Sequence, residues 1–331
     1  MKYLVTGGAG YIGSHLVDRL MAERGNEVVV IDDLSTGKLA NVRSHAGKRN
    51  FRFMRGDVCN AATMRKACAG ADVILHMAAV VGVKHYVTNP LRVLHVNTAG
   101  TSNVLEEARR QDAKVVFAST SEVYGRSTAL PLREDGERLL GATSVDRWCY
   151  STSKAFDEHL CLAYRKQHGL PVAILRYFNS YGPRALGNDY AGVVGIFMRR
   201  ALAGQQPLVH GDGRQTRCFT FITDTVDGTF AAMRGRRAEG QVINIGNTKE
   251  TTILSLANTI CSLANSRSKK QLAPRLIPYE QFYGRSYEDI RRRVPSMEKA
   301  WKFLHWKPKV PPERGLRLTY SWYSGNGRKS A

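Results

Sequence analysis

The chain has 331 residues, of which 43% are hydrophobic and 23% charged, with six cysteines and a formal net charge of +21 at pH 7. This composition allows a full hydrophobic core and excludes a largely disordered chain. The cysteines show no paired or His-linked spacing, so we expect no metal site, and reduced thiols favour a cytoplasmic location.

The strong positive charge would attract nucleic acid or an anionic small substrate. Basic residues are spread along the chain and no nucleic-acid motif appears, so we expect no nucleic-acid partner. No stretch is long and apolar enough to span a bilayer, so we also expect no membrane insertion.

The first elements form a βαβ pattern. Residues 2–6 predict a strand, 12–24 a helix, and 27–32 a second strand that ends in acidic residues. The pattern then repeats, with strands expected at 51–57, 71–79, 114–120 and 171–179 and helices at 61–70, 97–112 and 149–169. Continuous Val, Ile and Leu runs in these strands indicate a parallel sheet that is buried on both faces.

We therefore predict an α/β fold, with a Rossmann-type doubly wound parallel sheet. From about Gly182 onward, Gly, Pro and Arg become frequent and the elements shorten. We place a first domain at 1–179 and a smaller α/β domain at 180–331, and we expect the strand-like stretch 241–246 to return to the first sheet.

The stretch TGGAGYIG supplies Gly7, Gly10 and Gly13 at the turn from the first strand into the first helix. Backbone amides in such a turn can approach a pyrophosphate, because no Cβ is in the way and the helix N-terminus favours an anion. Asp32 ends the next strand, where a carboxylate binds the ribose hydroxyls of NAD and repels the 2′-phosphate of NADP. The pattern favours NAD, although Lys38 and Arg43 lie nearby in the sequence.

The stretch YSTSK places Tyr150 and Lys154 four residues apart on an expected helix, so both lie on one face. A nearby ammonium and a cationic nicotinamide would both favour the phenolate of Tyr150. Tyr150 is therefore a candidate proton acceptor. Asp57, after the third strand, fits either an adenine contact or a turn at the strand end.

The ordered stretches TGGAGYIG, HMAA, STSEVYG, YSTSK and RYFNSYGPR resemble the extended short-chain dehydrogenase/reductases that act on nucleotide sugars. This resemblance covers nearly the whole chain. It implies that the first domain binds NAD and the second a UDP-sugar, and that the protein is a homodimer through helices around 98–110 and 150–167. The implied cofactor residues are Gly7, Gly10, Tyr11, Ile12, Gly13, Asp32, Asp57, Val58, Ala78, Ala79, Asn97, Tyr150 and Lys154.

Members of this family open the reaction by oxidising the sugar at C4. The resemblance implies Thr120, Tyr150 and Lys154 as the catalytic set, with Asn179 and Arg217 at the substrate diphosphate. The fate of the 4-keto sugar then separates 4-epimerases, 4,6-dehydratases and decarboxylases.

Ser121 and Glu122 resemble the pair found in UDP-glucuronate decarboxylases, whereas dehydratases carry Asp-Glu there. The stretch 282–300 resembles their substrate-closing segment, with Arg293 of an Arg-x-Pro motif near the substrate carboxylate and Tyr287 beside it.

We expect an NAD-dependent enzyme that most resembles the decarboxylases of UDP-glucuronate. Glu122 and Arg293 complete the candidate catalytic residues, and Ser121 and Tyr287 the substrate-binding ones. A UDP-sugar 4-epimerase is the alternative, and a 4,6-dehydratase fits less well. An NAD-sensing regulator or RNA-binding protein on the same fold is disfavoured, because such a protein would be expected to lose Tyr150 or Lys154.

Overall fold

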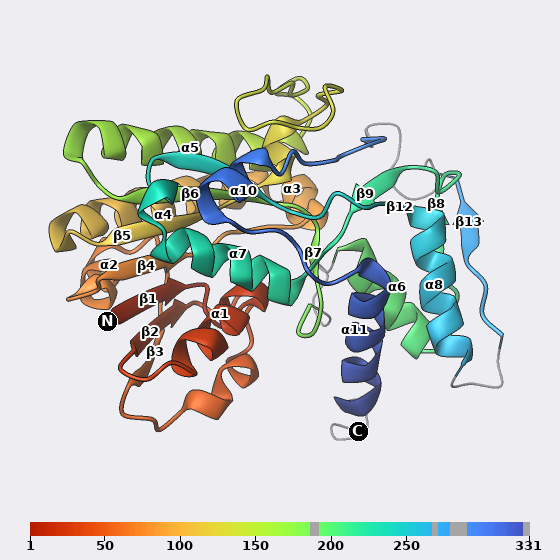
Figure 1. Cartoon of the computed structure of the whole chain (residues 1–331), viewed down its shortest axis with the longest axis horizontal. Coiled ribbons are helices and arrows are strands. Elements are labelled where there is room, and N and C mark those ends of the chain that lie inside the picture. Colours follow the sequence, from red (N-terminus) through yellow and green to blue (C-terminus); the bar gives the residue numbers. More distant parts are fainter. Residues whose placement is uncertain (186–191, 267–270, 279–289, 327–331) are drawn as a thin grey trace.

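The computed structural model describes residues 1–185, 192–266, 271–278 and 290–326 (Figure 1). Its centre is a sheet of seven strands in the order β11-β6-β5-β4-β1-β2-β3, and every neighbouring pair is parallel. The strands are β1 (Lys2–Thr6), β2 (Glu27–Asp32), β3 (Phe51–Arg55), β4 (Val73–His76), β5 (Lys114–Thr120), β6 (Val172–Tyr177) and β11 (Gln241–Ile245). The predicted Rossmann-type sheet is confirmed.

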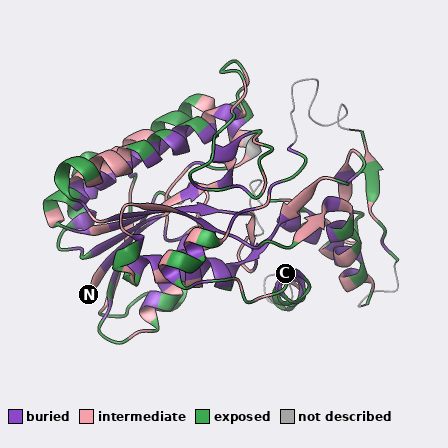
Figure 2. Ribbon diagram, turned by 45° about the horizontal axis from the view of Figure 1, so that its top comes forward, coloured by how far each residue is buried: buried purple, intermediate pink, exposed green. Residues whose placement is uncertain are grey.

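Helices cover both faces of this sheet (Figure 1). One face packs against α2 (Ala61–Cys68), α4 (Pro90–Gln111) and α5 (Trp148–His168), and the other against α1 (Tyr11–Met21), α7 (Ile222–Arg234) and α10 (Glu298–Leu304). Neighbouring residues of a strand point to opposite faces, so Leu4 and Val5 enter different cores, and both are fully buried. All the strands of this sheet except the edge strand β3 are accordingly buried along most of their length (Figure 2).

The sheet draws on distant parts of the chain. The strand β11 pairs with β6 along its whole length, with Val242 opposite Ile174 and Asn244 opposite Arg176. The helix α7 adds Ile222, Val226 and Phe230 to the same core as β5 and β6. Residues after 180 therefore form one edge and part of one face of the sheet.

The remaining elements lie mainly beyond one end of the sheet, at the right of Figure 1. The short strands pair as β7 (Ser180–Tyr181) with β10 (Thr220–Phe221), β9 (Thr216–Cys218) with β12 (Glu250–Thr252), and β8 (Leu208–His210) with β13 (Arg275–Ile277). The helices there are α6 (Val193–Leu202), α8 (Ile253–Asn265) and α11 (Pro312–Asn326). Further short helices are α3 (Val83–Thr88), η1 (Leu39–Asn41), η2 (Arg43–His45), η3 (Ser121–Tyr124) and η4 (Arg236–Ala238).

Several boundaries differ from the expected ones, among them the start of α4 and the end of β4. The helix α4 begins at Pro90 instead of 97, because the side chain of Asn89 caps it by accepting a 3.2 Å hydrogen bond from the amide of Arg92. The strand β4 ends at His76, so residues 77–79 leave the sheet instead of extending the strand.

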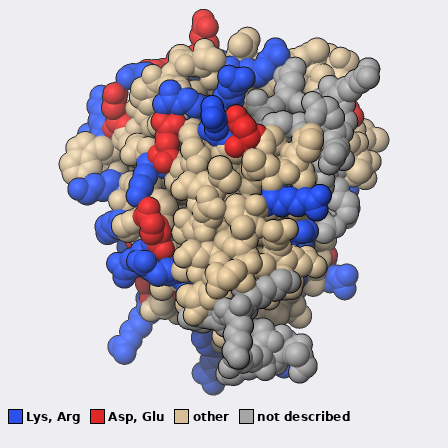
Figure 3. Space-filling model, turned by 90° about the vertical axis from the view of Figure 1, so that its right-hand side faces the viewer, with Lys and Arg blue, Asp and Glu red and all other residues tan. Residues whose placement is uncertain are grey.

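The basic residues are spread along the chain, and one face of the molecule shows how they lie on the surface. On the face shown in Figure 3, Lys and Arg side chains are interspersed with Asp and Glu near one margin and leave a broad area of other residues. None of the helices in the described part of the chain could cross a membrane.

Candidate active site

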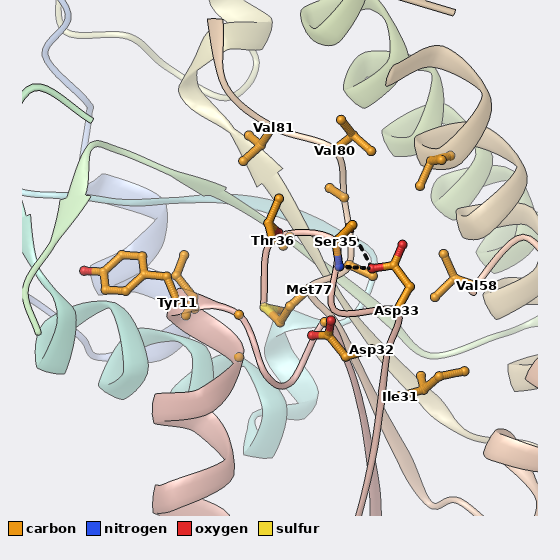
Figure 4. A pocket seen from close by; sticks show the side chains of 18 of the residues that line it. Tyr11, Ile31, Asp32, Asp33, Ser35, Thr36, Val58, Met77, Val80 and Val81 are labelled. Carbon is orange, nitrogen blue, oxygen red and sulfur yellow. Dashed lines mark hydrogen bonds between the residues drawn. The ribbon is translucent and has the colours of Figure 1, made fainter. Parts of the chain in front are cut away.

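A cleft of about 280 Å³ opens at the carboxyl ends of β1 to β5 (Figure 4). Parallel sheets of this kind bind ligands at that edge, where the loops after the strands diverge. All the predicted cofactor residues except Asn97, Tyr150 and Lys154 line the cleft. The structure thus brings the glycine turn, Asp32, Asp57 with Val58, and Ala78 with Ala79 together around one cavity.

The glycine turn leaves no room for side chains. Gly7 has a φ of +65°, and a Cβ there would lie 2.8 Å from the backbone nitrogen of Ala78. A Cβ on Gly13 would overlap the carbonyl oxygen of Gly7. The backbone of Gly10 and Tyr11 begins α1 at this point, so unobstructed amides face the cleft at the positive end of a helix.

Asp32 lies directly below this turn and is only 7% exposed. Its carboxylate accepts 2.9 Å hydrogen bonds from the amides of Ala9 and Leu34. Burial raises the pKa of Asp32, and these hydrogen bonds oppose that effect. A carboxylate at this position favours ribose hydroxyls over a phosphate, as predicted for NAD.

The residues expected to perform the oxidation lie beyond the far end of the cleft. Tyr150 and Lys154 are both nearly fully buried in the first turns of α5. Lys154 donates a 2.9 Å hydrogen bond to the carbonyl of Ala118 and lies 4.5 Å above the ring of Phe117. Burial raises the pKa of Tyr150 and so does the charge of Glu122, while a hydrogen bond with the Thr120 hydroxyl lowers it. Tyr150 therefore remains a neutral phenol unless a further positive charge arrives.

A buried ion pair adjoins this group. Arg293 donates a 2.5 Å hydrogen bond from Nη1 to Oε1 of Glu122, and the same nitrogen lies 3.5 Å from the hydroxyl of Ser121. Arg147 approaches the other Glu122 oxygen at 3.7 Å. Burial would raise the pKa of Glu122, but the charge and hydrogen bond of Arg293, with Arg147, lower it to about 2. Glu122 is therefore ionised at neutral pH.

Arg293 retains unused hydrogen-bonding capacity. Its side chain is 3% exposed, and its Nε and Nη2 atoms have no hydrogen-bond partner among the residues that the structure describes. A buried guanidinium whose donors are only partly used can bind a second anion.

Other predicted residues lie in different surroundings. Asn97 is buried behind the cleft wall, where its amide oxygen accepts a 2.8 Å hydrogen bond from the amide of Val80. Asn179 lines a smaller adjoining pocket and donates to the carbonyl of Cys218 at 3.1 Å. Arg217 donates from Nη1 to the carbonyls of Thr216 at 2.8 Å and Ile290 at 2.6 Å. Tyr287 lies outside the described residues.

Some site residues were missed by the sequence reasoning. Asp33 binds the amide and hydroxyl of Ser35 at 2.9 and 2.7 Å, and both residues line the cleft (Figure 4). The turn-forming stretch DDLSTG is a signal that could have identified them. Tyr86 of α3 stacks on the Tyr150 ring with centroids 4.8 Å apart and an interplanar angle of 10°. No local pattern indicates this contact, because α3 and α5 are far apart in the sequence.

Comparisons with known proteins agree with this geometry. A family model described as the NAD dependent epimerase/dehydratase family matches residues 3–246. The chain is 42% identical over 322 residues to UDP-N-acetyl-alpha-D-glucosaminuronate decarboxylase of Bacillus cytotoxicus, with 97% of each chain covered. It is 38% identical over 323 residues to UDP-glucuronic acid decarboxylase 1 of Danio rerio, covering 98% of this chain and 72% of that relative.

A solved structure of UDP-glucose 4-epimerase from Thermotoga maritima with UDP-glucose has a TM-score of 0.87 to this chain at 30% identity. The match covers 98% of this chain and 99% of the other. The family model spans nearly the whole sheet and the residues that line the cleft, and it ends before Arg293. The chain therefore belongs to the NAD-dependent epimerase/dehydratase family.

Proposed function

We propose that the protein is an NAD-dependent decarboxylase of a UDP-linked hexuronate. The observation that carries this proposal is the buried Arg293, which is paired with Glu122 and whose Nε and Nη2 have no hydrogen-bond partner among the described residues. A uronate differs from other sugars of its class by a carboxylate at C6, and a guanidinium binds a carboxylate through two parallel hydrogen bonds. Two relatives named above are decarboxylases of UDP-linked uronates, which supports the same reading.

The cleft fits NAD, because the glycine turn offers bare amides to a pyrophosphate and Asp32 is available to a ribose. Gly7, Gly10, Gly13 and Asp32 would hold the cofactor, with Asp57 and Val58 at the adenine. When bound, NAD supplies a hydride acceptor next to the sugar C4, and later the hydride that reduces C4 again.

In the first step, Tyr150 accepts the proton of the sugar 4-hydroxyl as C4 is oxidised to a ketone. The Thr120 hydroxyl already lowers the pKa of Tyr150, and the positive charge of the bound cofactor adds to that effect. Lys154 supplies a buried ammonium on the same helix face. The ketone lies β to the C6 carboxylate, so oxidation itself prepares the bond that breaks next.

In the second step, the C5–C6 bond breaks and CO2 leaves, and the electron pair of that bond stays on the sugar as an enolate across C4 and C5 with negative charge on the C4 oxygen. C5 then takes a proton from water, which restores the C4 ketone for the final reduction. We assign Arg293 and Ser121 to orienting the carboxylate before this step. Glu122 stays ionised, so it accepts hydrogen bonds and directs the Arg293 guanidinium. The negative charge moves from the carboxylate to the C4 oxygen, where the Tyr150 and Thr120 hydroxyls donate.

A panel of substrates tests the proposal. The protein is incubated with NAD and, separately, UDP-glucuronate, UDP-N-acetylglucosaminuronate and UDP-glucose, and the products are followed by mass. Loss of one CO2 from either uronate is the expected result, and the two uronates distinguish a hydroxyl from an acetamido group at C2. Inversion at C4 without a change of mass would show a 4-epimerase, and loss of one water a dehydratase.

We propose further that the protein is a homodimer through the outer sides of α4 and α5. Leu91 and Leu94 of α4 are 77% and 36% exposed, and Phe156 of α5 is 51% exposed. Such apolar side chains on two adjacent helices are typical of an interface. Replacing both Leu94 and Phe156 with Glu should convert a dimer to a monomer in light scattering, and an unchanged mass would contradict this interface.

A further inference from the structure

Arg293 belongs to a segment that forms hydrogen bonds with the rest of the protein both before and after this residue. We call residues 290–296 the strap. Near its start, the amide of Thr216 donates to the carbonyl of Arg291 at 2.9 Å, and Arg217 donates to Ile290. Near its end, Leu132 pairs with it, donating from its amide to the carbonyl of Val294 at 2.7 Å and accepting from the amide of Ser296 at 2.8 Å. Arg293 lies between these two attachments.

A single side chain, that of Asn244, binds both Leu132 and the end of the strap. Asn244 of β11 is fully buried, and its Nδ2 donates to the carbonyls of Leu132 at 2.9 Å and Ser296 at 3.2 Å. Its Oδ1 accepts a 2.7 Å hydrogen bond from the hydroxyl of Tyr124. Two carbonyl neighbours require the amide NH2 to face the strap, which settles the orientation of the side chain.

The catalytic helix has a separate anchor, an ion pair to which Asn244 makes no hydrogen bond. Tyr124 ends η3, which also contains Ser121 and Glu122, and its ring lies 4.7 Å below the guanidinium of Arg176. Arg176 binds both oxygens of Glu158 on α5, at 2.9 and 2.7 Å. Glu158 lies one turn after Lys154 on this helix.

We propose that Asn244 is a positioning residue for the decarboxylation step, fixing the strap at the place where Arg293 meets Glu122 and the substrate carboxylate. The inference rests on the function proposed above. Thr120, Tyr150 and Lys154, which oxidise C4, are carried by β5 and α5 and need no contact with the strap. Loss of Asn244 should therefore leave oxidation intact and slow only the step that requires Arg293.

The test separates the two steps. Asn244→Ala removes all three side-chain hydrogen bonds, and Tyr124→Phe removes one of them. The matched control is Tyr177→Phe, since the buried Tyr177 hydroxyl makes a 2.8 Å hydrogen bond to Thr229 and lies 3.9 Å from the sulfur of Met77, and none of its hydrogen bonds within the described residues involves Asn244 or the strap. Each variant is mixed with NAD and the uronate that the wild type accepts. Oxidation is followed by the absorbance of the reduced nicotinamide and by the 4-keto uronate, and decarboxylation by CO2.

For Asn244→Ala we expect CO2 release to fall by about 100-fold, as for a catalytic group displaced by roughly 1 Å, while the initial oxidation rate changes by less than about twofold. The 4-keto uronate and the reduced cofactor should then accumulate. Tyr124→Phe should show a smaller loss in the same direction, and Tyr177→Phe none. In the protein without ligands, hydrogen exchange of strap amides should be faster in Asn244→Ala than in Tyr177→Phe.

Equal loss of both steps in Asn244→Ala, or equal behaviour of Tyr124→Phe and Tyr177→Phe, would overturn the positioning role. If Asn244→Ala does not fold, the positioning role is tested by comparing CO2 release in Tyr124→Phe and Tyr177→Phe. A wild type that releases no CO2 from any uronate would refute the proposed function itself, which is a different outcome from a wild type that works and variants that fail to separate the steps.

Discussion

Replacing Glu122 with Gln should destabilise the folded protein, because Gln keeps the shape of the side chain and removes its charge. Arg293 and Arg147 would then be left as partly or fully buried cations without their carboxylate partner. Glu122 is 27% exposed, and these arginines lower its pKa from an ordinary 4.5 to about 2 in spite of burial. That difference corresponds to about 3 kcal/mol of stability at neutral pH.

The sign of the pH dependence follows from the lowered pKa. A carboxylate whose pKa is lower in the folded than in the unfolded state contributes its full stabilisation above the unfolded value and loses it as the pH falls toward the folded value. The gap between wild type and Glu122→Gln should thus be about 3 kcal/mol at about pH 7 and narrow to about 1.5 kcal/mol at about pH 3. Urea unfolding of the protein without NAD, followed by circular dichroism, measures this gap.

The control for this variant is a second Arg–Glu ion pair in the same chain, with a similar distance between nitrogen and oxygen. Arg133 and Glu298 lie 2.8 Å apart, but their side chains are 53% and 68% exposed. Exposed ion pairs of this kind often contribute nothing measurable to stability. Glu298→Gln should therefore have the same free energy of unfolding as the wild type. A Glu122→Gln variant as stable as the wild type at neutral pH, or a gap that widens in acid, would refute the reasoning.

Three further predictions concern the cofactor end and the oxidation step. Tyr150→Phe should lower turnover by about 1000-fold while NAD is retained, whereas Tyr164→Phe on the same helix should remain active; comparable activity of the two would contradict proton transfer by Tyr150. Gly13→Ala should abolish NAD binding in calorimetry, because its Cβ overlaps a carbonyl oxygen, while Gly325→Ala, with no atom within 4 Å of its Cβ, should bind normally. Asp32→Asn should shift the ratio of affinities toward NADP by about tenfold, or about 1.4 kcal/mol, and an unchanged ratio would place the cofactor choice elsewhere.

Local patterns were sufficient to predict much of this molecule. The glycine turn, the acid that ends β2 and the Val-rich strands are local features with few alternatives, so the sheet and the cleft lining could be predicted from them. The start of α4 could not, because it depends on the cap formed by Asn89 and not on hydrophobic periodicity.

The reactive end depends on contacts between distant segments. Glu122 and Arg293 are 171 residues apart, and only resemblance to relatives suggested that they belong to one site. The sequence offers no local reason for Tyr86 to stack on Tyr150, or for Arg217 to donate to the strap carbonyl of Ile290. Such contacts arise from packing of the folded chain, which residue patterns do not encode.

The place of β11 and α7 has a consequence for how the protein is synthesised and dissected. When β6 leaves the ribosome, the strand that covers its edge and the helix that covers Leu175 have not yet been made. Until β11 is synthesised, the edge of β6 has no strand to pair with, and an unpaired strand edge is prone to aggregation. A fragment ending at residue 179 should therefore be poorly soluble, and a chimera that exchanges cofactor-binding halves between relatives must carry residues 222–245 with residues 1–179.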